Sequence, residues 1–300
     1  MSSATAVLFD APGPRARRRH FILTVLGALG IAAVTLLLIR ALAAKDQFTL
    51  EKWQPFADPV TWTAYLLPGL RGTLVAAFFS VILAIIFGIA LGIGRLSGLA
   101  PVRWACGAFV EFFRAVPVLM MMLFAYYVCL FALQISGNYL ALYGVVAGLT
   151  FYNSSVIAEL IRSGVGALPS GQREAGLAIG LTPFATLWSI LLPQAITLML
   201  PSIISQLVVI LKDSALGFLI LYEELTRSGQ TLASSEGNLI PTFLVIAVIY
   251  IVVNYALTLL ARRLERRLQR SKRGLKPPPE DVELNPEMLP VAAEASARSR

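Results

Sequence analysis

The sequence predicts an all-α integral membrane protein with about six transmembrane helices and both chain ends in the cytoplasm. Hydrophobic residues make up 57% of the 300 residues and charged residues only 14%, whereas a soluble domain is about half apolar and a quarter charged. The apolar residues form long uninterrupted blocks, and basic residues lie beside them. The net charge of +8 is therefore interpreted as a signal of membrane orientation, and no nucleic-acid partner is expected.

Five or six apolar blocks are long enough to cross a bilayer core, which takes about 20 residues of helix. The candidates are residues 21–39, 66–94, 106–133, 142–160, 194–211 and 240–260. The first is longer than the apolar part of a signal peptide, so we expect it to remain as a transmembrane helix. A further patch, residues 216–222, is too short to span. It is left open as a re-entrant segment, an interfacial segment or an extension of the fifth span.

Basic residues predict the orientation of these spans. Four arginines lie within residues 15–19, and eight Lys or Arg residues lie within 262–276. An even number of spans puts both groups on one side, which the positive-inside rule makes cytoplasmic. Residues 1–20 are thus a basic cytoplasmic N-terminus, 40–65 an extracytoplasmic segment, and 263–300 a basic cytoplasmic segment followed by a disordered tail. The expected location is the cytoplasmic membrane.

The loop at residues 161–193, between the fourth and fifth spans, carries the most informative pattern. Ser170 is the expected N-cap of a short helix, with Glu174 in its first turn. Gly180 can end that helix with a positive φ, and Thr182 with Pro183 starts a second one, which Pro193 breaks before the fifth span. Its exposed positions are apolar: Leu177, Ala178 and Leu181. An apolar helical loop in the cytoplasm indicates a soluble partner.

The run Glu174-Ala175-Gly176, then Gly180, then Ile190-Leu191-Leu192-Pro193 resembles the EAA motif of ABC-importer permeases, with Gly176 where alanine is usual. Residues from roughly 66 to 262 are similar to polar amino-acid permeases. The motifs are Gly72-Thr73-Leu74, Phe113-Arg114-Ala115-Val116-Pro117-Val118-Leu119, Ala158-Glu159-Leu160-Ile161-Arg162-Ser163-Gly164, Leu192-Pro193-Gln194-Ala195, Leu200-Pro201 and Leu211-Lys212-Asp213-Ser214-Ala215-Leu216. The second and last of these most resemble permeases of glutamate uptake. The resemblance implies a type I ABC-importer transmembrane domain over residues 66–262.

That resemblance also implies an assembly. A pair of ATP-binding subunits docks on the loop, with coupling residues Glu174, Ala175, Gly176, Gly180, Leu192 and Pro193. A second permease, identical or distinct, completes the pathway, and an extracytoplasmic solute-binding protein delivers the solute. The chain has no G-x-x-x-x-G-K-[ST] phosphate-binding loop, so it is expected to be no enzyme and to need no cofactor. Glu174 either meets a basic residue of the ATPase or only caps its own helix.

The expected function is ATP-driven import of a polar amino acid, with glutamate or aspartate preferred. One alternative is the same machinery for another polar or basic amino acid. Another is a secondary transporter, which would need an ion site of its own and has no use for the apolar loop. A membrane enzyme is disfavoured because the chain has one histidine, two cysteines and no clustered acidic pairs at catalytic spacing.

Ionisable residues within spans are costly and so are candidates for the substrate pathway. Lys212 and Asp213 either bind the carboxylate and ammonium of an amino acid or form a structural ion pair. Arg114 either lies near a gate or anchors the third span at the interface. The candidates are Lys212, Asp213, Gln206, Glu159 and Arg114.

For two of these candidates a helix partner is the preferred alternative. Glu159 either touches the solute or pairs with Arg162 at i, i+3. Gln206 is expected to bond another helix rather than a ligand. Ala84, Gly88 and Gly92 form a small-residue stripe, either for packing inside the chain or for the permease–permease seam. No catalytic or metal site is expected.

Overall fold

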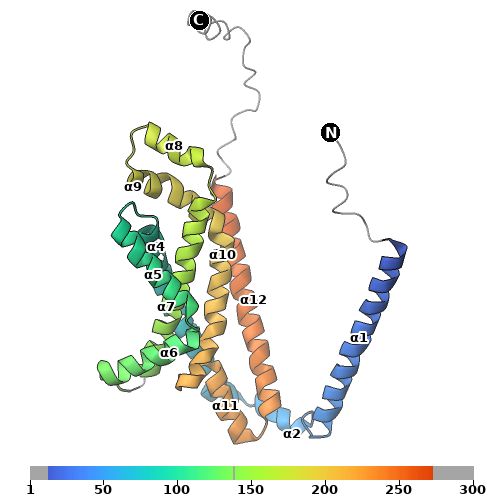
Figure 1. Ribbon diagram of the computed structural model, residues 1–300. Helices are drawn as coiled ribbons and strands as arrows, with labels where there is room; N and C mark the ends of the chain where they lie inside the picture. Colours follow the sequence, from blue (N-terminus) through green and yellow to red (C-terminus); the bar gives the residue numbers. More distant parts are fainter. Residues whose placement is uncertain (1–12, 138, 273–300) are drawn as a thin grey trace, which may run out of the picture. The chain divides into compact units, whose positions relative to one another are not determined.

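The computed structural model describes residues 13–137 and 139–272, with side chains through Arg263. Within these residues every regular element is a helix (Figure 1). The α-helices are α1 Pro14–Ala43, α2 Leu50–Trp53, α3 Pro59–Thr61, α4 Leu67–Arg95, α5 Ala100–Ala115, α6 Val118–Tyr127, α7 Leu140–Gly166, α8 Ser170–Ala178, α9 Pro183–Thr186, α10 Leu192–Asp213, α11 Leu225–Glu236 and α12 Leu239–Lys272. The chain divides into two compact units, Met1–Leu74 with Leu221–Ile249 and Val75–Ile220 with Tyr250–Arg300.

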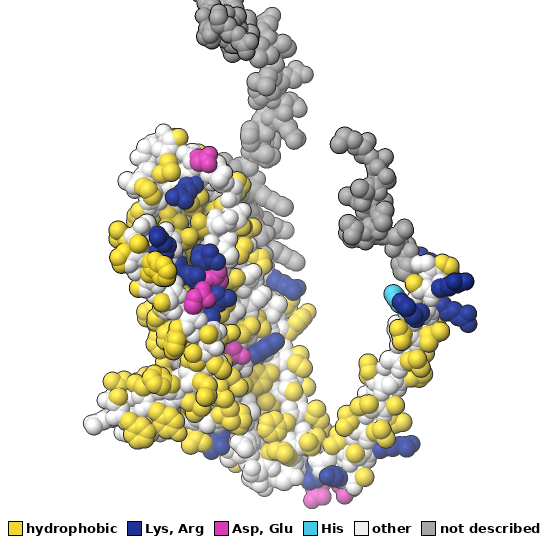
Figure 2. Space-filling view, viewed as in Figure 1, with side chains coloured by type: hydrophobic (Ala, Val, Ile, Leu, Met, Phe, Trp, Pro, Cys, Tyr) yellow, Lys and Arg dark blue, Asp and Glu magenta, His cyan; other side chains and the backbone are white. Residues whose placement is uncertain are grey.

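In the first unit, α1 is an apolar helix with no buried residue, and Figure 2 shows hydrophobic side chains along its length. It begins at Pro14, so the arginines at 15–19 belong to its first turns instead of preceding it. A helix that is apolar all round and has no packed face is suited to lipid or to another membrane helix. The expected span at 21–39 therefore lies within a longer helix.

The rest of the first unit is held by a junction between the start of α4 and the segment before α11. Gly72 lies so close to the Glu223 carbonyl that a side chain there would collide with it. The Tyr222 hydroxyl donates to the Gly72 carbonyl at 2.8 Å, and the Leu225 N–H donates to Thr73 Oγ1 at 3.1 Å. Burial, with Glu224 nearby, raises the pKa of Tyr222 to about 12, which keeps the phenol neutral as a donor. The Gly72-Thr73 motif thus builds this junction.

In the second unit, α7 is the central helix, in contact with α5, α6 and α10. Small residues permit the close approaches. A Cβ on Gly148 of α7 would lie 2.7 Å from the Met122 backbone nitrogen of α6. On the other side of α7, Gly88 of α4 packs on Ile157. The stripe at Ala84, Gly88 and Gly92 therefore serves packing inside the chain, which was one of the two interpretations left open by the sequence.

The expected third span, residues 106–133, is wrong as a single helix. It is two helices, Ala100–Ala115 and Val118–Ala132, bent by 104° at the break. Pro117 cannot donate a backbone hydrogen bond and disfavours helical geometry at the residue before it. Val116 accordingly has ψ 131°, in the extended region, and Pro117 becomes the N-cap of α6. A hydrophobic count alone cannot detect such a break.

Two expectations about the loop before the fifth span also change. Pro169 is the N-cap of α8 and Ser170 its first residue, so no side chain caps it. Pro193 does not break the chain, because a π-helical turn at Leu187–Leu191 runs directly into α10. The wider turn accommodates the missing N–H and the proline ring. The patch at 216–222 continues this helix as a 3₁₀ segment, Ser214–Ile220.

Five described helices are long and apolar enough to cross a membrane, and the number is six if the bent pair is counted as one span. The expected number of about six spans is therefore confirmed for the described residues. The tail that was expected to be disordered and the first twelve residues fall outside the described part, and the basic C-terminal segment is described as far as Lys272.

Candidate functional site

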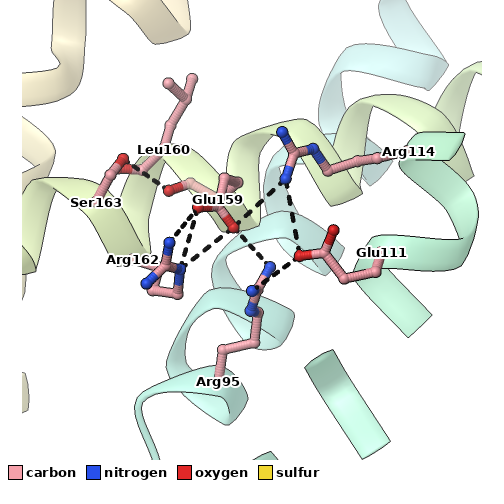
Figure 3. A network of polar contacts seen from close by, with 7 residues as sticks. All are labelled: Arg95, Glu111, Arg114, Glu159, Leu160, Arg162 and Ser163. Atoms are coloured by element: carbon pink, nitrogen blue, oxygen red, sulfur yellow. Dashed lines mark hydrogen bonds and ion pairs between the residues drawn. The ribbon is translucent and has the colours of Figure 1, made fainter. Parts of the chain in front are cut away.

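Five charged residues from three helices form one network in the second unit (Figure 3). Glu159 of α7 is its centre: one oxygen is 2.6 Å from Arg95 of α4 and 3.6 Å from Arg114 of α5. The other oxygen accepts hydrogen bonds from Arg162, one turn further along α7. Glu111 of α5 joins the edge, 3.1 Å from Arg95 and 3.9 Å from Arg114. One carboxylate thus ties α4, α5 and α7 together.

Two members of this network, Arg95 and Glu159, are largely buried, so their pairing matters more for stability than that of exposed surface pairs. The side chains of Arg95 and Glu159 are 12% and 20% exposed, whereas that of Glu111 is 62% exposed. A charge removed from water this far must be paired, and loss of its partner is costly. Three arginines face two glutamates, so the network keeps one positive charge in excess. The expected Glu159–Arg162 pair is present, and Arg114 reaches the same carboxylate.

The remaining pathway candidates lie on α10. Gln206 donates to Asn153 Oδ1 of α7 at 2.6 Å, which is the expected bond to another helix. Lys212 is exposed and Asp213 half-buried at the end of α10. Lys212 lines a groove of about 510 Å³. The other lining residues are Val208 and Ala215 on the Lys212 side and, from α12, Tyr250, Ile251, Asn254, Tyr255 and Thr258. Among the described residues, no hydrogen bond or ion pair joins Lys212 or Asp213 to Glu159 or Arg114.

Three residues of these sites were missed from the sequence. Arg95 was not among the candidates, although it ends α4 and is the most buried arginine of the network. Glu111 stands three residues before Arg114, a helical spacing that can reveal such pairs. Asn153 lies fully buried within α7, and nothing in its sequence neighbourhood predicts Gln206 as its partner.

The coupling segment consists of α8, a turn at Gly180 and α9. Gly180 has φ +85°, so its predicted positive φ is confirmed. Thr182 Oγ1 accepts from the Ala185 N–H at 3.2 Å, as expected of an N-cap. Gly176 is buried against α9 and the π turn, and a Cβ there would lie 2.6 Å from Thr186 Cγ2. Glycine in place of the usual alanine is what lets the two helices meet.

The outer side of this segment is exposed and largely apolar. Ile179 is 75% exposed, and Phe184 stacks on Trp188 with both rings exposed. Glu174 is exposed in the second turn of α8, and no acidic residue lies in the first turn. The alternative that Glu174 caps its own helix is therefore wrong. Of the other coupling candidates, Ala175 and Pro193 are exposed, whereas Leu192 is buried at the start of α10.

The described residues form apolar helices long enough to cross a membrane, a bent helix pair and an exposed helical loop. Residues 84–270 match the family of binding-protein-dependent transport system inner membrane components. The chain belongs to this family, and it is an integral membrane permease.

Similar proteins of known type extend the comparison. The chain is 51% identical over 228 residues to the glutamate transport system permease protein GluD of Corynebacterium glutamicum, covering 76% of this chain and 84% of the relative. It is 31% identical over 208 residues to the glutamate/aspartate import permease protein GltK of Escherichia coli, covering 68% and 93%. A solved structure of an amino acid ABC transporter with histidines matches with a TM-score of 0.62 at 28% identity, covering 69% and 96%.

Proposed function

We propose that this chain is the permease subunit of an ATP-driven importer that carries glutamate, with aspartate as a second substrate, across the cytoplasmic membrane. The observation that carries the proposal is the 51% identity to a glutamate transport permease over 228 residues. The second relative, named for glutamate and aspartate, supports the same substrate class. Both chain ends lie in the cytoplasm in this proposal, because arginines begin α1 and follow the last span.

A pair of ATP-binding subunits binds the coupling segment in this proposal. Three exposed apolar side chains on and beside α8 and α9 support it: Ile179, Phe184 and Trp188. A loop that faces only water is not expected to expose such a surface. Glu174 stands on the same segment, where it can pair with a basic side chain of the partner. A second permease and an extracytoplasmic binding protein complete the assembly, and ATP is hydrolysed by the partner subunits.

The proposed pathway must handle two carboxylates and one ammonium group. Lys212 provides a positive charge on a groove within the span, and the polar atoms of Asn254 and Tyr255 line the same groove. Asp213 follows directly and offers the opposite charge for the ammonium group. The network at Glu159 and Arg114 has one positive charge in excess, which suits an anionic solute near it.

Reconstituted vesicles test this function. With the partner permease, binding protein, ATPase and ATP present, we expect uptake of glutamate and aspartate to exceed that of glutamine and arginine. Without the ATPase, uptake against a gradient should vanish. Uphill uptake by the permeases alone would overturn the proposal in favour of a secondary transporter, and preferred uptake of a neutral or basic amino acid would overturn the substrate.

Two substitutions separate coupling from substrate recognition. Glu174→Lys should abolish ATPase co-purification and ATP-driven uptake, while the matched change Glu51→Lys on α2 should leave both intact. Lys212→Met should weaken glutamate transport with ATPase binding unchanged. If Lys212→Met leaves affinity and specificity as they were, Lys212 has only a structural role.

A further inference from the structure

A groove of about 930 Å³ lies between the ends of α4 and α7 and the segment that carries α8 and α9. Its wall is mostly apolar, and the apolar part includes Ala90, Ile93, Val102, Leu187 and Leu191. Two arginines, Arg162 and Arg173, line it, and no carboxylate from the described part of the chain does. This groove is separate from the one at Lys212, although Arg162 and Phe184, which the proposed function also uses, lie on its wall.

The groove lies where two spans end. It is lined by the last turns of α4, which ends at Arg95, and of α7, which ends at Gly166. The ends of spans lie at the membrane surface, where the headgroups of phospholipids are found. Apolar side chains are exposed along its walls, with Leu99 67% and Phe184 66% exposed. The groove therefore offers a lipid both an apolar wall and a position at headgroup depth.

The charge of the groove selects the headgroup. Arg173 is exposed on α8, and Arg162 uses its Nε and Nη2 for Glu159 while its side chain remains 46% exposed. Ser170, the first residue of the nine-residue helix α8, also lines the groove, and a helix N-terminus carries partial positive charge. Basic pockets between membrane helices bind anionic headgroups by this combination of charge and apolar surface.

We propose that this groove binds a phospholipid with an anionic headgroup, such as phosphatidylglycerol. The phosphate pairs with Arg173 and Arg162, and the acyl chains follow the apolar wall toward the bilayer. The lipid then bridges the end of α7 and the first turn of α8, so it braces the base of the coupling segment. This proposal goes beyond amino-acid transport and does not depend on which solute is carried.

Lipid retention by the purified full chain tests it, with native mass spectrometry as the readout. The probes are phosphatidylglycerol, the zwitterionic phosphatidylcholine, and glycerol 3-phosphate as a headgroup without acyl chains. We expect retention of phosphatidylglycerol over phosphatidylcholine, and no competition by glycerol 3-phosphate at equal concentration. Arg173→Gln should weaken phosphatidylglycerol binding about fivefold, the effect of one basic residue near a lipid surface. Arg71→Gln, which removes an exposed arginine from the first turns of α4, is the matched control and should change nothing.

A second variant tests the apolar part of the site without changing its charge. Gly166 lines the groove, and an added Cβ would meet nothing within 4 Å, so Gly166→Phe should place a ring in the groove and abolish retention. Equal retention of the two lipids, or equal effects of Arg173→Gln and Arg71→Gln, would overturn the proposal. Displacement by glycerol 3-phosphate would reduce the site to one for a free anion. Displacement of the lipid by the purified ATPase subunit would make the groove part of that interface instead.

Discussion

At the scale of single residues, Glu159 is a mostly buried carboxylate whose charge depends on arginines from three helices. It is the one carboxylate that contacts three arginines among the described side chains, and it is four-fifths buried. Arg95, itself nearly buried, has Glu159 and the exposed Glu111 as its carboxylate partners. The spacing to Arg162 was visible in the sequence, but the convergence of Arg95 and Arg114 depends on how three helices pack.

Glu159→Gln should therefore destabilise the chain far more than Glu111→Gln. Removal of one partner from a buried ion pair costs about 3–5 kcal/mol, and partial exposure of the network lowers our expectation to about 2 kcal/mol. An exposed pair such as Arg114–Glu111 contributes at most about 1 kcal/mol. Thermal unfolding in detergent, with ligand absent, measures both changes. Equal unfolding midpoints for the two variants would contradict the larger structural role that burial gives Glu159.

Gly176 offers a second prediction at this scale, because it meets α9 where a methyl group has no room. Gly176→Ala adds helix propensity worth about 1 kcal/mol but puts a Cβ 2.6 Å from Thr186 Cγ2. We expect the steric clash with Thr186 to outweigh the gain in helix propensity. The two helices α8 and α9 should then separate, and trypsin should cleave faster at Arg173.

The double change Gly176→Ala with Thr186→Ser removes that methyl and should restore slow cleavage. Gly171→Ala, where the added Cβ meets nothing within 4 Å, is the control. Faster cleavage in the double variant than in Gly176→Ala alone would contradict the steric explanation.

At the scale of elements, apolar length and some local signals were predictable, whereas the N-cap of α8 and the effect of two prolines were not. Thr182 with Pro183, and Gly180, carry local signals that specify a cap and a positive φ whatever surrounds them. Whether a helix is interrupted at Pro117 or Pro193 depends on the residues packed around each proline. The chain bends at Pro117, whereas a π turn carries the helix past Pro193. Propensity treats these prolines alike, so sequence alone could not separate a broken span from a continuous one.

The packing of α6 on α7 gives a prediction for an element pair. Gly148 lies against the backbone of Met122, which cannot rotate away as a side chain can. Gly148→Ala should force the helices apart and destabilise the chain by about 1–3 kcal/mol, as overpacking of a tight core does. Gly166→Ala on the same helix meets open space and should be neutral or slightly stabilising. Thermal unfolding of both variants tests whether Gly148→Ala alone lowers the unfolding midpoint. Equal midpoints would show that α6 moves freely on α7.

At the scale of the whole molecule, the side of the membrane on which each loop lies is a prediction from charge. Arginines at 15–19 and 262–263, with Arg95, Arg103 and Arg162 beside the span ends, favour the cytoplasm. If both ends are cytoplasmic, Glu174 on α8 faces the cytoplasm and Glu51 on α2 faces outward. Single cysteines at these two positions, in a chain with Cys106 and Cys129 changed to serine, make the orientation measurable.

In intact cells, a membrane-impermeant thiol reagent should label the Glu51→Cys chain and spare the Glu174→Cys chain. Inverted membrane vesicles should reverse the result, and detergent should expose both, because each position is exposed in the fold. Labelling of Glu174→Cys from outside would place α8 and α9 beyond the reach of any ATP-hydrolysing partner. In that case the apolar surface at Ile179 and Phe184 would need another occupant, and the coupling proposal would fail while the fold stood unchanged.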